Sequence, residues 1–138
     1  MEGMQAFRRR HLHELDLRRT EFVCVECVGG PTLTMLEGEG MLRMRDYPLE
    51  MRERLMSAAR AAGVPISRGL RTVAATDALV LLRAGCRVVT LASIAPTKLP
   101  LNYHWPNDRP EALHWETIAD AAAVCEEFIR RDGSDAPE

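Results

Sequence analysis

The run from Phe22 to Val28 limits most strongly the folds that this chain can adopt. It reads FVCVECV, is apolar at positions that would face both sides of a sheet, and is followed by a Gly-Gly-Pro stop at residues 29–31. Such a run is typical of an interior strand of an α/β sheet, with helices covering both faces. We therefore expect neighbouring strands on both of its edges. Because few other strands are expected, the chain has the character of part of a larger sheet.

Glu26 is the one charged residue of this run and lies near its carboxyl end. A buried, unpaired carboxylate is costly, so Glu26 requires a cation, a cluster of hydrogen-bond donors or a raised pKa. Ligands of open α/β sheets bind at the carboxyl ends of strands, which makes Glu26 a candidate binding residue. The alternative is a Glu on a strand edge that faces water.

His104 lies in a second candidate segment, residues 99–110, which reads LPLNYHWPNDRP. Its three prolines predict a loop, because each removes a backbone donor and restricts the preceding residue. Imidazole is a common zinc ligand, and a carboxylate such as Asp108 often orients the ring through its other nitrogen. The alternative is a loop histidine packed between Tyr103 and Trp105.

The remaining periodicity predicts alternating strands and helices. We expect helices over residues 3–16, from Pro48 to a stop at Gly63, over 77–84 and over 118–129, strands over 32–36, 70–75 and 88–93, and a turn at 37–40. Thr76 or Asp77 is expected to cap the third helix. This order is an α/β pattern.

Composition indicates one domain over residues 1–131, with a polar, disordered tail over 132–138. The net charge of −2 does not show the excess of basic residues that is typical of a nucleic-acid-binding domain. Charged residues interrupt the longest apolar stretch, so no membrane span is expected, and no export signal is recognised. The four cysteines are therefore expected to be reduced thiols in the cytoplasm.

Cys24 and Cys27 form a CxxC motif, which raises the alternatives of redox or zinc chemistry. Within a strand, residues three apart point to opposite faces, which disfavours both alternatives. A redox CxxC opens a helix, and a zinc knuckle needs a second ligand pair, whereas Cys86 and Cys125 stand singly. We interpret the cysteines as small buried hydrophobic residues.

Several segments resemble the two-zinc metallopeptidases of the bacterial leucyl aminopeptidase and glutaminyl cyclase superfamily. FVCVECVGG is similar to the family's strand that ends in a carboxylate ligand, normally Asp. LEGEGMLRMRDYP, ATDALVLLRAG and NYHWPNDRPEALHWETI are similar to the segments that lead through a Ser/Thr-Asp helix to the final His ligand. The similarity covers residues 1–131. It implies a mixed sheet with helices on both faces, as in the carboxyl-terminal half of a zinc-exopeptidase domain.

The resemblance also implies a site. It makes Glu26 and His104 candidate zinc ligands, Asp108 the partner behind the His104 ring, and Asp77 a polar group near the metals. In that family two zinc ions activate a water that hydrolyses peptide substrates, and a Glu serves as general base. That Glu, the first His and the bridging Asp precede the segment that matches residues 4–10, so we assign no catalytic residue to this chain.

Glu26 departs from the family's Asp by one methylene, enough to displace a ligand in a rigid site. The sequence therefore predicts the carboxyl-terminal part of a zinc-dependent aminopeptidase-like enzyme, inactive alone, whose missing groups a complementing chain would have to supply. The alternative is a non-catalytic remnant that acts through association, including self-association. The histidines at positions 11, 13 and 114 are expected in solvent or capping roles.

Overall fold

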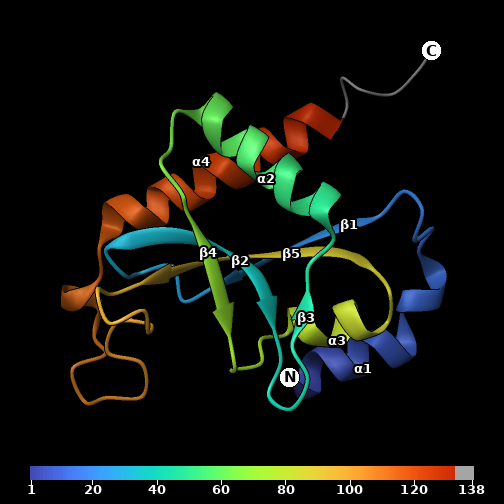
Figure 1. The fold of residues 1–138 in the computed structure, drawn as a ribbon, viewed down its shortest axis with the longest axis horizontal. Helices are drawn as coiled ribbons and strands as arrows, with labels where there is room; N and C mark the ends of the chain where they lie inside the picture. The colour runs from blue at the N-terminus through green and yellow to red at the C-terminus, as the bar shows by residue number, and fades with distance from the viewer. Residues whose placement is uncertain (133–138) are drawn as a thin grey trace.

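The computed structural model describes residues 1–132, in which five strands form one mixed sheet between two layers of helices (Figure 1). The strands are β1 (Glu21–Glu26), β2 (Thr32–Glu39), β3 (Arg45–Asp46), β4 (Ser67–Thr72) and β5 (Arg87–Ile94). The α-helices are α1 (Glu2–Arg10), α2 (Leu49–Ala62), α3 (Ala78–Arg83) and α4 (Trp115–Asp132), and short 3-10 turns cover Leu12–Glu14 and Pro110–Ala112. The α/β fold, with a mixed sheet and helices on both faces, is confirmed.

The strand order is β1-β5-β2-β3, and β4 pairs with β2 as well. β1 and β5 are parallel, with Glu26 opposite Ala92, so their carboxyl ends meet at the same edge of the sheet. β2 runs antiparallel to β5 and parallel to β4. This topology places β1, which contains Glu26, beside β5, which precedes the loop of His104.

Each face of the sheet buries its own apolar cluster. α2 and α4 cover one face, where Met35 and Leu91 of the sheet meet Leu55 and Val124 of the helices. α1 and α3 cover the other face, where the sheet residues Leu36, Val88 and Ala92 pack with Tyr47 and Leu81. Burial of these side chains removes apolar surface from water and drives the packing of the layers. Within residues 1–132, no helix is both long and apolar enough to cross a membrane.

The expectation that residues 22–28 form an interior strand is wrong. β1 lies at the edge of the sheet and pairs only with β5 in the described part of the chain. Its residues are half-buried, and Val25 is 48% exposed. β5 is an interior strand, and its residues 88–93 are all buried because it lies between β1 and β2.

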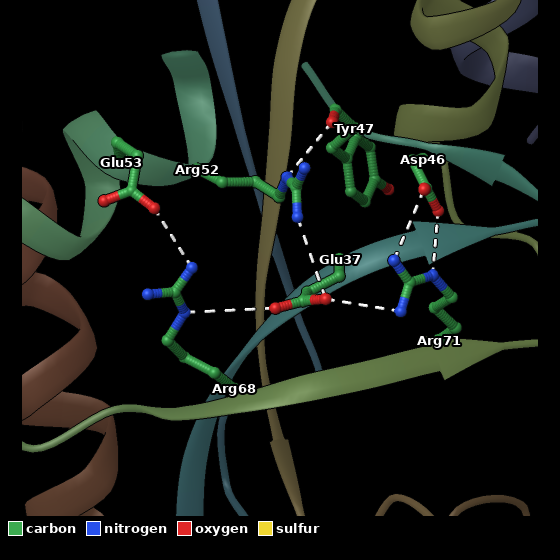
Figure 2. A network of polar contacts seen from close by, with 7 residues as sticks. All are labelled: Glu37, Asp46, Tyr47, Arg52, Glu53, Arg68 and Arg71. Atoms are coloured by element: carbon green, nitrogen blue, oxygen red, sulfur yellow. Dashed lines mark hydrogen bonds and ion pairs between the residues drawn. The ribbon is translucent and has the colours of Figure 1, made fainter. Parts of the chain in front are cut away.

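The expected turn at residues 37–40 is also wrong, because β2 continues to Glu39. Gly38 permits this continuation, since a Cβ there would lie 2.7 Å from the Arg45 carbonyl oxygen. Figure 2 shows the Glu37 carboxylate among three guanidinium groups, those of Arg52, Arg68 and Arg71. The charged segment that was expected to form a turn is therefore part of a strand. The Glu37 carboxylate in it is stabilised by arginines of α2 and β4.

Other boundaries differ by smaller amounts. The expected helix over residues 3–16 is interrupted at His11, between α1 and a 3-10 turn. β4 begins and ends three residues before the expected strand over 70–75. α2 and α3 are confirmed, and α4 is confirmed and extended at both ends as far as Asp132. The remaining expected tail residues, 133–138, lie outside the described part.

Candidate functional site

A cavity of about 240 Å³ opens beside the carboxyl ends of β1 and β5. It lies on the face of the sheet that α1 and α3 partly cover, since Leu36 and Ala92 of that core form part of its wall. The remaining lining residues are Glu26, Cys27, Leu70, Thr72, Ala74, Ala75, Thr76, Ser93, Ile94, Lys98, Leu99, Pro100 and Tyr103. A mostly apolar pocket with a few polar groups is the usual form of a small-ligand site.

Glu26 and Cys27 form the polar wall at the end of β1. The Cys27 thiol donates a hydrogen bond to Glu26 Oε1 at 3.4 Å. Burial raises the pKa of Cys27 to about 11, helped by that hydrogen bond and by the negative charges of Glu26 and Asp108. The thiol is therefore protonated at neutral pH and acts as a donor to the carboxylate, not as a nucleophile.

The expectation that the two CxxC thiols point to opposite faces of one strand is corrected by the backbone. β1 ends at Glu26, and Cys27 turns into the left-handed region with φ +52°. Burial raises the pKa of Cys24 too, with a contribution from the Glu26 charge, so both thiols lie in the field of this carboxylate. Both are half-buried free thiols.

His104 lies at the exposed side of the site. Its backbone is left-handed, with φ +63°, and its ring stacks on Tyr103 with 3.9 Å between ring centroids. Tyr103 lines the cavity, whereas Trp105 is 71% exposed, so the ring does not pack between the two aromatic residues. Within residues 1–132 no hydrogen bond joins His104 to Asp108, and the predicted orienting role of Asp108 gains no support from this geometry.

Asp108 nevertheless lies close enough to Cys27 to raise its pKa, so the loop that carries His104 folds back over the end of β1. Two hydrogen bonds hold the turn after β1, one to the backbone beyond the loop and one to a side chain of β5. Gly29 accepts a hydrogen bond from the His114 amide at 3.0 Å, and Ser93 Oγ accepts one from the Gly30 amide at 2.6 Å.

Ser93 also donates to the Cys27 carbonyl oxygen, which ties the turn after β1 to the end of β5. A Cβ on Gly29 would lie 2.5 Å from a methyl carbon of Leu113, so a larger residue there requires the Leu113 side chain to shift. Neither Ser93 nor Leu113 was predicted as a site residue from the sequence. A small polar residue at the end of an apolar strand was the available signal.

Thr76 and Asp77 approach the site from the start of α3. Thr76 lines the cavity. Its backbone amide and its hydroxyl both donate hydrogen bonds to the buried Glu39 carboxylate, at 2.6 Å and 3.0 Å respectively. The Thr76 hydroxyl accepts from the Ala78 amide at 3.1 Å and so satisfies the first amide of α3, while the N-cap residue is Asp77, whose side chain makes no capping hydrogen bond. The Asp77 charge contributes to the raised pKa of Cys24, and Asp77 pairs with the Met1 amino group at 3.1 Å.

The residues present do not fit a complete zinc centre. Catalytic zinc sites use three protein ligands, and structural sites use four. In the described part of the chain, no group of three or more His, Cys, Asp or Glu side chains is arranged to hold a metal ion. Glu26 already accepts a hydrogen bond from Cys27, and the His104 ring stacks on Tyr103.

Comparison of the chain with protein-family models and with curated protein sequences finds no match. Functional inference therefore depends on the residues themselves and on their arrangement. The segments that contain Glu26, Thr76 and Tyr103 are separated by 50 and 27 positions in the chain, yet all three residues line one cavity.

Proposed function

We propose that this chain represents the carboxyl-terminal part of a zinc-dependent aminopeptidase-like metallopeptidase and is inactive by itself. The observation that supports this proposal concerns three segments that resemble segments of the two-zinc metallopeptidases. All three reach one cavity at the carboxyl ends of the parallel strands β1 and β5. These are the segments of Glu26, of Thr76–Asp77 and of Tyr103–His104. Carboxyl ends of adjacent strands are where α/β proteins place their ligands.

In a complete enzyme, Glu26 and His104 would each supply one zinc ligand, and the metal would activate the water that hydrolyses the peptide. The wall formed by Leu36, Leu70 and Leu99 suits an apolar side chain of a peptide substrate. No residue of this chain is assigned as general base. The four free cysteines accord with a reducing compartment such as the cytoplasm, which we include in the proposal.

Calorimetric titration with zinc, together with assays on aminoacyl chromogenic substrates, tests this proposal. We expect weak zinc binding and no turnover, because two ligands do not complete a site. His104→Ala and Glu26→Ala should each weaken the residual binding, whereas the control His114→Ala, which removes another exposed histidine, should not. Zinc affinity that is unchanged by both Glu26→Ala and His104→Ala would contradict the proposal. Zinc-dependent turnover abolished by His104→Ala would contradict the claim of inactivity.

A non-catalytic remnant that acts through association is the second candidate function. The observation that favours it is the open edge of β1, a strand rich in apolar residues that has one pairing partner in the described part of the chain. Such edges favour association with another chain. Retained folding and association, with zinc binding insensitive to both ligand substitutions, would favour this candidate over the first.

A further inference from the structure

The outer edge of β1 offers a backbone surface for pairing. β1 spans Glu21–Glu26 and pairs with β5 along its whole length, while no strand of residues 1–132 pairs with its other side. Alternate amide and carbonyl groups of β1 therefore point outward without a strand partner. An edge of this kind is a template for a further strand unless charge, proline or a bulge blocks it.

Apolar side chains border this edge. A groove of about 510 Å³ runs between the start of β1 and α4, and its apolar lining includes Val23, Phe128 and Ile129. Val25 is 48% exposed and Ile129 is 72% exposed. Exposed apolar groups that adjoin an open strand edge mark an interaction surface more strongly than the same groups scattered singly.

The two ends of β1 carry opposite charge. Arg18 and Arg19 are exposed at its amino end, and their guanidinium groups make no ion pair within residues 1–132. Glu21 at the same end is already matched by Arg54, at 3.1 Å, and by Arg87. Asp16, which accepts a hydrogen bond from the Arg18 amide, and Glu50, which pairs with Arg87, also lie there, so the four arginines at positions 18, 19, 54 and 87 exceed the three carboxylates at positions 16, 21 and 50 by one positive charge.

The carboxyl end of β1 is negative. Glu26 closes the strand, and Asp108 lies near enough to act on the adjacent Cys27 thiol. Lys98, which lines the same cavity as Glu26, offsets one of these two negative charges and leaves one in excess. Antiparallel pairing of two copies of β1 would place each positive amino end beside the partner's negative carboxyl end. Parallel pairing would place like charges together, which is unfavourable.

We propose that the edge of β1 pairs antiparallel with β1 of a second copy of this chain, so that a two-fold axis joins two sheets into one. A two-fold axis normal to the sheet makes the contact isologous, which means that both copies use the same surface. The attraction between Arg18 and Arg19 of one copy and Glu26 of the other therefore occurs twice. The same contact brings the exposed Val25 of each copy into the interface. An unrelated peptide strand would satisfy the backbone groups but not the paired charges.

Light scattering after size-exclusion chromatography, over a concentration series, tests this proposal. We expect a concentration-dependent dimer for the unmodified chain. Reversing the charge at one end, with R18E and R19E together, or at the other end, with E26K, should raise the dissociation constant about tenfold or more. R10E is the matched control, because Arg10 is an exposed arginine at the end of α1, and it should leave the dimer unchanged.

Mixing the two charge-reversed variants provides the decisive measurement. In a mixed dimer the new glutamates of one copy face the new lysine of the other, and the remaining pair of ends is unmodified, so dimerisation should return. Circular dichroism of each variant verifies folding, and recovery on mixing is expected only from folded chains. A monomer at every concentration would overturn the proposal. A dimer that resists both reversals, or no recovery from folded variants, would overturn the assignment to this edge.

Discussion

The Tyr47 hydroxyl donates a hydrogen bond to the Glu39 carboxylate in a place where both side chains are excluded from solvent, with exposed fractions of 1% and 0%. Thr90 Oγ1 lies 2.7 Å from the same hydroxyl, and Thr76 donates to the carboxylate from its amide and its hydroxyl. The network joins β2, β5, the segment between β3 and α2, and the loop before α3. It satisfies a buried carboxylate through hydrogen bonds.

Tyr47→Phe should destabilise the fold by about 1–3 kcal/mol, because it leaves a buried carboxylate oxygen without one of its donors. The free energy of unfolding from urea denaturation measures this loss. Tyr103→Phe removes a hydroxyl from a side chain that is 49% exposed and should change the same quantity by less than about 0.5 kcal/mol. Equal effects of the two substitutions would contradict the structural role given to Tyr47.

Glu37→Gln should destabilise the fold by about 1–2 kcal/mol. The carboxylate is 15% exposed and lies 3.3 Å from Arg71, 3.7 Å from Arg52 and 3.9 Å from Arg68, so its loss leaves neighbouring positive charges without their shared partner (Figure 2). Urea denaturation at low and high salt measures this effect, which should shrink as salt screens the arginines.

The matched control is Glu126→Gln on α4. Glu126 pairs with Arg130 at 2.6 Å, but both side chains are exposed, so the change should cost less than about 0.5 kcal/mol. An effect at Glu37 as small as that at Glu126 would show that the arginine cluster needs no shared carboxylate.

Cys27 should resist alkylation at neutral pH. Its pKa of about 11, raised by burial and by Glu26, leaves little thiolate below pH 9. Mass-spectrometric mapping of the maleimide-modified residue against pH should give a midpoint near that value. Glu26→Gln should lower the midpoint by removing the negative acceptor, while burial keeps it above the ordinary value. Rapid modification of Cys27 at pH 7 would contradict this account.

Stability should decline as the solution becomes alkaline. Burial raises the pKa of Tyr47 and of all four cysteines above their ordinary values, so the unfolded chain loses these protons first. Stability from these groups is complete below about pH 9, where both states hold the protons, and falls as the pH rises through the folded-state pKa values. Urea midpoints between pH 7 and pH 11 measure this. A midpoint that stays constant would contradict the burial of these groups.

Elements that depend on local pattern were predictable. The apolar stripe that begins α2, its stop at Gly63 in the left-handed region with φ +70°, and the periodicity of α4 are properties of consecutive residues. The apolar run of β5 was likewise sufficient to identify a buried strand. Glu26 and the loop of His104 could be nominated from residue type and position alone.

The sequence by itself thus determined the helices α2, α3 and α4 and the buried strand β5, because propensity and periodicity act over a few residues. Only the tertiary structure decided that β1 is an edge strand, that Glu39 is buried in a strand, and that Tyr103 reaches the cavity beside Glu26. Each of these depends on pairing between residues far apart in the chain. The residues of a strand do not specify which strands pair with its two edges. The position of a single Glu in the sequence likewise does not specify which hydrogen-bond donors surround it in the fold.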